Sequence, residues 1–61
     1  MLVRREYNMD GTWLHMRFVN KAYICEKLRH DEFGDTITLE HSRHNVRKDA
    51  NTWMDSRVKR S

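Results

Sequence analysis

The sequence predicts an α+β fold: a small antiparallel β-meander of three or four strands with one C-terminal α-helix packed on one face. Apolar and polar residues alternate over much of residues 1–41, and the two glycines lie in polar clusters that interrupt this alternation. After residue 42, apolar residues recur at a helical period instead. A chain of 61 residues forms at most one domain, 1–61, and its core is thin.

The first two strands are expected at about residues 2–8 and 12–19, on either side of Asp10 and Gly11. An Asp-Gly pair between alternating segments favours a two-residue type I′ turn, because both central residues of that turn need positive φ. Counting outward from this turn gives the pairs Met9 with Thr12, Tyr7 with Leu14, Arg5 with Met16 and Val3 with Phe18. The turn therefore places Tyr7 on the apolar face of the hairpin.

Two more strands are expected at about residues 22–28 and 35–41. The facing of the third strand depends on the length of the turn before it. With a three-residue loop at 19–21, the residues that join Phe18 are Ala22, Ile24 and Leu28, and Glu26 is also turned inward. With a two-residue turn at 20–21, they are Tyr23 and Cys25 instead. We prefer the three-residue loop.

A helix is expected at about residues 43–58, with Ser42 as its N-cap. The apolar stripe of this helix consists of Val46, Ala50, Trp53, Met54 and Val58. It needs an apolar surface to cover, and the large one available is a single face of the sheet. The residues expected on that face are Val3, Leu14, Met16, Phe18, Ile37 and Leu39.

Charge is distributed unevenly along the chain. Residues 1–41 carry six Lys/Arg and seven Asp/Glu, a net charge of −1, whereas residues 42–61 carry six Lys/Arg and two Asp/Glu, a net charge of +4. Such asymmetry indicates an electropositive surface for an anionic partner, although a solvated helix face has the same composition. The single cysteine, Cys25, cannot form an internal disulfide, which favours the reducing cytoplasm.

The sequence does not favour an enzyme. It contains no phosphate-binding loop, nucleotide fingerprint or His-Glu-x-x-His motif, and a chain of 61 residues has little room for a concave catalytic pocket. We therefore expect no catalytic residues and no cofactor. Cys25, His30, His41 and His44 are residue types that bind zinc, but their spacing lacks the paired knuckles of zinc fingers, so we expect no metal site either.

Nucleic-acid binding is the sharper hypothesis. Alternation places Trp13, His15 and Arg17 on the sheet face away from the helix, where aromatic rings can stack on bases and cations can neutralise phosphates. Tyr23 and Lys27 are candidates to lie beside them. At the start of the expected helix the basic residues are Arg43, Arg47 and Lys48. We expect a small nucleic-acid-binding regulator, with DNA favoured over RNA as its partner.

The alternative hypothesis is a protein that binds another protein. Very short proline-free chains are typical of phage or mobile-element products that bind and inhibit a host protein, and Phe33 in an acidic loop is a candidate anchor. A second copy of the chain is a further candidate partner, as a homodimer. No apolar run approaches the roughly 18 residues of a membrane span, so we expect no membrane partner.

Overall fold

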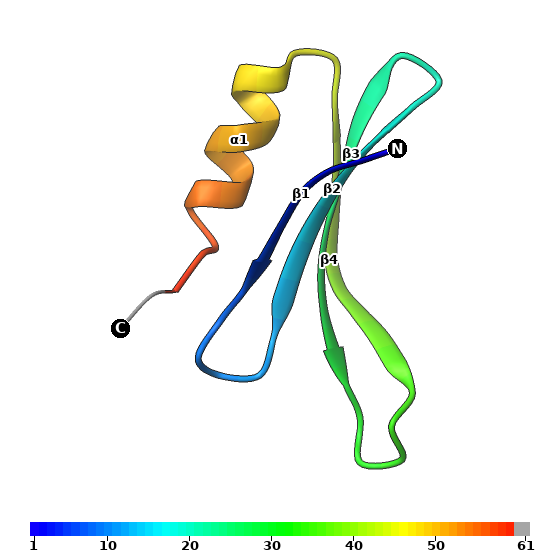
Figure 1. The fold of residues 1–61 in the computed structure, drawn as a ribbon, viewed down its shortest axis with the longest axis vertical. Coiled ribbons are helices and arrows are strands. Elements are labelled where there is room, and N and C mark those ends of the chain that lie inside the picture. Colours follow the sequence, from blue (N-terminus) through cyan, green and yellow to red (C-terminus); the bar gives the residue numbers. More distant parts are fainter. Residues whose placement is uncertain (60–61) are drawn as a thin grey trace.

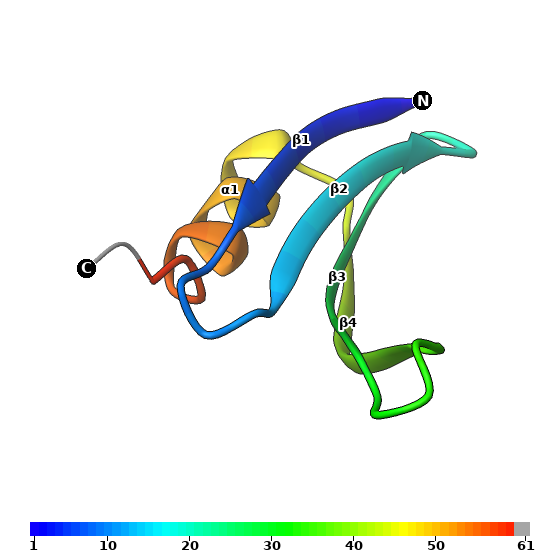
Figure 2. The same ribbon diagram turned by 60° about the horizontal axis from the view of Figure 1, so that its bottom comes forward.

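The chain forms one four-stranded antiparallel sheet and one helix in the computed structural model, which describes residues 1–59. Strands lie in the order β1-β2-β3-β4, and the elements are β1 (Leu2–Tyr7), β2 (Trp13–Val19), β3 (Ala22–His30), β4 (Thr36–His44) and α1 (Arg47–Asp55). The helix lies on one side of the sheet (Figures 1 and 2). This arrangement confirms the predicted α+β meander.

The β1–β2 hairpin has a different turn from the predicted one. The Asn8 amide donates to the Thr12 carbonyl at 2.9 Å, which leaves a three-residue loop of residues 9–11. In this loop Gly11 has a φ of +88°, whereas Asp10 does not have positive φ. The Asp10 carboxylate instead accepts hydrogen bonds from the amide and the hydroxyl of Thr12, at 3.0 and 2.6 Å. A type I turn followed by a left-handed glycine is the usual geometry of such a loop.

This turn shifts the hairpin register by one residue. Tyr7 pairs with Trp13 and Glu6 with Leu14, so the predicted pairing of Tyr7 with Leu14 is wrong. A shift of one residue turns the side chains of a strand to the opposite face. Tyr7 therefore lies on the face away from the helix.

A β-bulge at the start of β1 reverses the one-residue shift, so the first residues of the strand face as predicted. The register shifts between Leu2 and Arg4, so Val3 is the additional residue. Val3 packs against the core, as predicted. Arg4 pairs with Met16 and reaches the helix, where it donates to Asn51 at 3.0 Å and to Asp55 at 2.7 Å.

Asn20 and Lys21 form the turn between β2 and β3. Both have positive φ, +51° and +61°, and Val19 pairs with Ala22, so this is the two-residue turn. The preferred three-residue loop is wrong. The two-residue turn is favoured over the three-residue loop because its positive φ values match the twist of the flanking strands, even though Lys21 occupies a position that favours glycine. As a consequence, Tyr23 and Cys25 face the helix.

The helix begins later than predicted, at Arg47 rather than residue 43. Ser42 is not its N-cap, because Ser42 to His44 continue β4 and pair with Tyr23 to Cys25 of β3. The Ser42 hydroxyl contacts Nε2 of His44 at 2.8 Å instead. Ladder hydrogen bonds over three further pairs outweigh one capping bond. The N-cap position is occupied by Val46, which makes no side-chain capping bond.

The core lies between α1 and one half of the sheet. Leu14, Met16, Cys25, Ala50 and Met54 are fully buried there. The partly buried apolar residues packed around them are Val3, Tyr23, Trp53 and Val58. Ala50, Trp53 and Met54 thus form the helix stripe as predicted, whereas Val46 is exposed and Val58 packs against the core from beyond the end of the helix at Asp55.

Phe18, Ile37 and Leu39 were expected on the face that the helix covers but lie outside the core, and Phe18 and Leu39 are exposed. A helix of nine residues is about 14 Å long, whereas the nine-residue strands β3 and β4 each span about 30 Å. The helix cannot cover both ends, and the end of the β3–β4 hairpin projects beyond it (Figure 1). No helix within residues 1–59 is long and apolar enough to cross a membrane.

The first prediction concerns this core. Truncating Met54→Ala should lower the free energy of unfolding by about 2–5 kcal/mol, because a buried methionine loses its packing and leaves a cavity. Such a loss would unfold much of a domain this small. Met9→Ala is the matched control, since Met9 is 77% exposed, and should change stability by less than about 0.5 kcal/mol. Urea unfolding followed by tryptophan fluorescence measures both. Equal stability of the two variants would contradict the assigned core.

Candidate nucleic-acid interface

The sheet face that α1 leaves uncovered, here called the open face, carries aromatic and basic side chains. Leu14 and Met16 are buried under the helix, so alternation places their neighbours in β2 on the opposite face. Cross-strand pairing then assigns residues of the other strands to the same face. The aromatic and ionisable residues of the open face are Arg5, Tyr7, Trp13, His15, Arg17, Glu26, His30, His41 and Arg43.

One row of side chains crosses all four strands of this face. Arg5 pairs with His15, His15 with Glu26, and Glu26 with His41. Nε2 of His15 lies 2.7 Å from Oε1 of Glu26, and Arg17 donates to the same oxygen at 3.0 Å. Glu26 thus neutralises part of the positive charge at the centre of the face.

The hydrogen bond with His15 lowers the pKa of Glu26 below its ordinary value, and burial opposes this change in part. The nearby positive charges of His15 and Arg17 lower this pKa further. Glu26 is therefore ionised over the whole neutral range. None of the ion pairs within residues 1–59 involves Arg5 or Arg43.

A hollow of about 440 Å³ lies at the end of the open face near the β1–β2 turn. Its lining residues are Arg5, Tyr7, Gly11, Trp13 and His30. The rings of Trp13 and His30 contact each other, with centroids 4.7 Å apart and planes inclined at 43°. Leu28, which pairs with Trp13, is buried. The Tyr7 side chain is 69% exposed, so its ring is accessible.

The structure divides the predicted site residues between two sides of the sheet. Trp13, His15 and Arg17 lie together on the open face, as predicted from their alternation. Arg43 joins them, but from β4 rather than from the helix, because it pairs with Ile24. Arg47 and Lys48 are exposed on the first turn of α1, on the other side of the sheet.

Lys27 lies on the helix side, and its predicted position beside Trp13 is wrong. It pairs with Leu14 of the core and with Glu40 of β4. Tyr23, also expected near Trp13, faces the helix and contacts Phe18, with ring centroids 4.8 Å apart. Both errors follow from the length of the turn at Asn20 and Lys21, which sets the facing of β3.

This face holds five further residues that were not predicted there from the sequence: Arg5, Tyr7, Glu26, His30 and His41. The first two were turned inward by the wrong hairpin register. A signal for the correct register was present in Asp10 and Thr12, because an Asp side chain that bonds the amide two residues later stabilises a right-handed turn. His30 and His41 become visible only once the lengths of β3 and β4 are known.

The four residues considered for zinc are not brought together. Cys25 lies in the core, where burial raises the pKa of its thiol. His30 and His41 belong to the open face, and His44 contacts Ser42 on the helix side. Within residues 1–59, no group of three or more His, Cys, Asp or Glu side chains is arranged to hold a metal ion.

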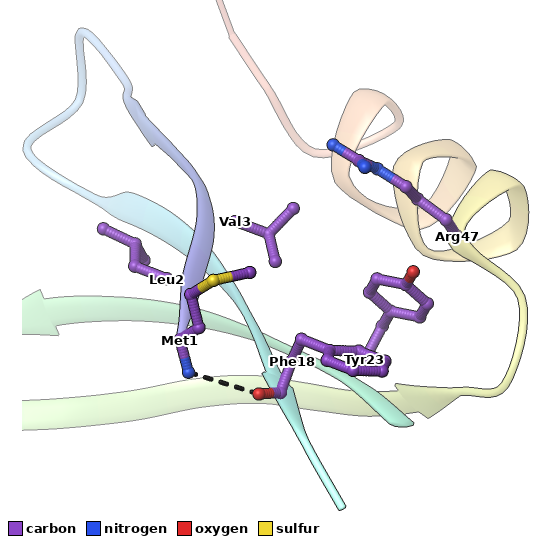
Figure 3. Close-up of a pocket in the computed structure, with 6 residues that line it drawn as sticks. All are labelled: Met1, Leu2, Val3, Phe18, Tyr23 and Arg47. Carbon is purple, nitrogen blue, oxygen red and sulfur yellow. Dashed lines mark hydrogen bonds between the residues drawn. The ribbon is translucent and has the colours of Figure 1, made fainter. Parts of the chain in front are cut away.

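A second hollow, of about 370 Å³, lies on the helix side near the first residue of the chain (Figure 3). It is lined by Met1, Leu2, Val3, Phe18, Tyr23 and Arg47. The lining side chains are apolar apart from the Arg47 guanidinium and the Tyr23 hydroxyl, and the amino group of Met1 donates to the Phe18 carbonyl at 3.2 Å. Both hollows contain aromatic rings and one arginine, but this one also has the aliphatic side chains of Met1, Leu2 and Val3, which the hollow on the open face lacks.

Comparisons with protein-family models, with curated proteins and with solved structures find no match to this chain. The function of the chain is therefore inferred from the geometry and charge of its two surfaces.

The second prediction concerns Glu26. A carboxyl group whose pKa is lowered on folding stabilises the fold above its ordinary pKa, about 4.3, and loses that contribution as the pH falls through the lowered value. Glu26→Gln should therefore be less stable than the unsubstituted protein at about pH 5, and this difference should shrink toward about pH 3. Urea unfolding at several pH values measures it.

Glu32→Gln is the matched control, because Glu32 is exposed in the β3–β4 loop. Its stability should follow that of the unsubstituted protein at every pH. A pH-independent difference for Glu26→Gln would mean that its contact with His15 and Arg17 does not hold in solution.

Proposed function

We propose that this chain is a small nucleic-acid-binding regulatory protein that works in the cytoplasm and binds through the open face of its sheet. One observation carries the proposal: the face left uncovered by the helix gathers three arginines, three histidines, a tyrosine and a tryptophan around a single carboxylate. An exposed sheet with aromatic and basic side chains suits the stacking of bases and the neutralisation of phosphates. A free, buried cysteine is compatible with a reducing compartment.

The two kinds of side chain on this face have different expected roles. Arg5, Arg17 and Arg43 come from three strands and carry positive charge for the phosphate backbone. Tyr7 and Trp13 are the stacking residues. Glu26 is the one acidic group in this set, and its position beside Arg17 reduces the net attraction for phosphates. DNA remains our first expectation for the polymer.

Arg47 and Lys48 make a separate, weaker contribution in this proposal. They lie on α1, and a ligand bound flat on the open face does not reach them without bending around the sheet edge. The basic helix thus adds long-range attraction rather than contacts.

The third prediction follows from this division. Binding of labelled duplex or single-stranded DNA should weaken steeply as salt rises, with a log–log slope of roughly −0.9 per phosphate neutralised on duplex DNA. Arg43→Ala should reduce the magnitude of this slope by about one phosphate contact, and Glu26→Gln should strengthen binding because it removes the opposing charge. Fluorescence anisotropy at two or more salt concentrations measures both effects.

Lys48→Ala is the matched control for Arg43→Ala, since both side chains are exposed cations and only Arg43 lies on the open face. It should leave the salt slope nearly unchanged. If Lys48→Ala weakens binding and Arg43→Ala does not, the helix is the interface. Absence of binding at low salt would refute the proposal.

A second candidate function is supported by the apolar end of the molecule. Three of the large apolar residues that line the hollow of Figure 3 are exposed: Met1, Leu2 and Phe18. A gathering of exposed apolar side chains on a small protein suits a protein partner. This surface favours the alternative of a phage-type or mobile-element-type protein that binds and inhibits a host protein.

The fourth prediction separates the two functions. If the first is correct, lysate proteins captured by the immobilised chain should be lost after nuclease treatment, because they are held through nucleic acid. If the second is correct, one stoichiometric protein should remain after nuclease treatment, and Phe18→Ser should abolish its capture. Phe33→Ser is the comparison variant, because Phe33, the anchor expected from the sequence, is 82% exposed in the β3–β4 loop. Loss of capture in Phe33→Ser but not in Phe18→Ser would place the interface at that loop instead.

A further inference from the structure

We propose that the hollow lined by Arg5, Tyr7, Trp13 and His30 receives one unpaired base of a single-stranded nucleic acid. The inference rests on the proposed function and specifies its ligand class: a single strand, rather than an intact duplex, is the preferred partner. Three properties of this hollow support the inference: its aromatic rings, its charge and its size.

Three rings surround the hollow. Trp13 and His30 contact each other at 4.7 Å between centroids, and Tyr7, the cross-strand partner of Trp13, is 69% exposed. The three rings come from three strands, since Tyr7 belongs to β1, Trp13 to β2 and His30 to β3. A flat ligand with a π-face fits such a site, and every nucleobase has one.

The cation is placed beside these rings. Arg5 lines the same hollow and takes part in none of the ion pairs within residues 1–59. When a base enters the hollow, the phosphate of the same nucleotide comes close to the hollow, where the Arg5 guanidinium attracts it. Aromatic stacking next to a backbone cation is the general arrangement by which proteins hold single strands.

The size of the hollow agrees with a single base. Its volume of about 440 Å³ lies at the lower end of the range for small-molecule clefts, roughly 300–1,000 Å³. A base inside a duplex is stacked and paired, so it reaches such a hollow only after it is extruded, which costs a few kcal/mol. The hollow therefore discriminates in favour of strands whose bases are already unpaired.

The remaining cations of the open face extend the site along the strand. Arg17 and Arg43 lie toward the other end of the same face, in the row that crosses Ile24. A single strand anchored by one base near the β1–β2 turn can continue across the sheet toward them. The single strand thus gains both the stacking contact and the charge contacts, whereas a duplex gains the charge contacts alone.

The experiment compares four labelled probes: short oligo-dT, short oligo-U, and DNA and RNA duplexes of equal length. Single strands should bind more tightly than duplexes, and Tyr7→Ala should weaken single-strand binding roughly 5- to 150-fold while leaving duplex binding unchanged. Phe33→Ala is the matched control for loss of an exposed aromatic ring and should change neither. Melting curves confirm that the variants are folded.

A spectroscopic readout tests the position of the base directly. In a Trp53→Phe background Trp13 is the one remaining tryptophan, and a base stacked in the hollow should quench its fluorescence. Oligo-dT and oligo-U should quench it, and the duplexes should not. The DNA and RNA arms show which polymer is preferred.

Failure of the inference and failure of the proposed function give different results. Equal binding of duplexes and single strands, with no effect of Tyr7→Ala and no quenching, would overturn the hollow as a base site while leaving the charged face as an interface. Absence of binding to all four probes at low salt would overturn both.

Discussion

The nine-residue helix is the constraint on which the rest of the structure depends, because it covers one half of one face of the sheet and nothing more. Five fully buried residues, Leu14, Met16, Cys25, Ala50 and Met54, make up the cluster it forms with the sheet. Arg4 reinforces this contact from β1, and Asn8 binds the segment after the helix through the Arg57 carbonyl and the Lys59 amide. A fold with so little core cannot also cover its second face, so that face has to be compatible with water.

Residues whose polarity follows the alternation of β2 and the period of α1 could be predicted from the sequence. Leu14, Met16, Ala50 and Met54 are each buried as expected, and Trp13, His15 and Arg17 turn away from them. What could not be predicted is the register of the hairpins, because it depends on one residue more or less in a turn. Asp10-Gly11 marks the position of a turn, and the Asp10–Thr12 pair is a local signal for its length, but the contacts of Asn8 with residues 57 and 59 come from far away in the sequence.

The candidate site was predictable to the same extent. Which residues of β2 face the site follows from alternation alone. Which residues of β1 and β3 face it depends on the lengths of the β1–β2 and β2–β3 turns. Tyr7 lies on the open face and Lys27 on the helix side, the reverse of the prediction in both cases. The physical reason is the same: side chains of a strand point alternately to its two faces, and the length of the preceding or following turn decides which face each one takes. Charge counted along the sequence was misleading here. The net charge of +4 in residues 42–61 indicated the helix as the cationic surface. However, Arg43 of that segment lies in β4, and Arg5 and Arg17 of the open face lie outside the segment.

Glu26 shows how a cationic face is reconciled with a weakly stabilised fold. Arg17 and His15 are neighbours on the open face, and both contact the Glu26 carboxylate. This carboxylate offsets the charge of Arg17 and, through its lowered pKa, stays ionised at neutral pH. The same carboxylate opposes the binding of phosphates, so the residue that helps the sheet to fold also limits its affinity. Arg5 and Arg43 take no part in the ion pairs of Glu26, so their charge is available for a ligand. The face therefore divides into a neutralised centre that stabilises the sheet and cationic margins that are available to bind.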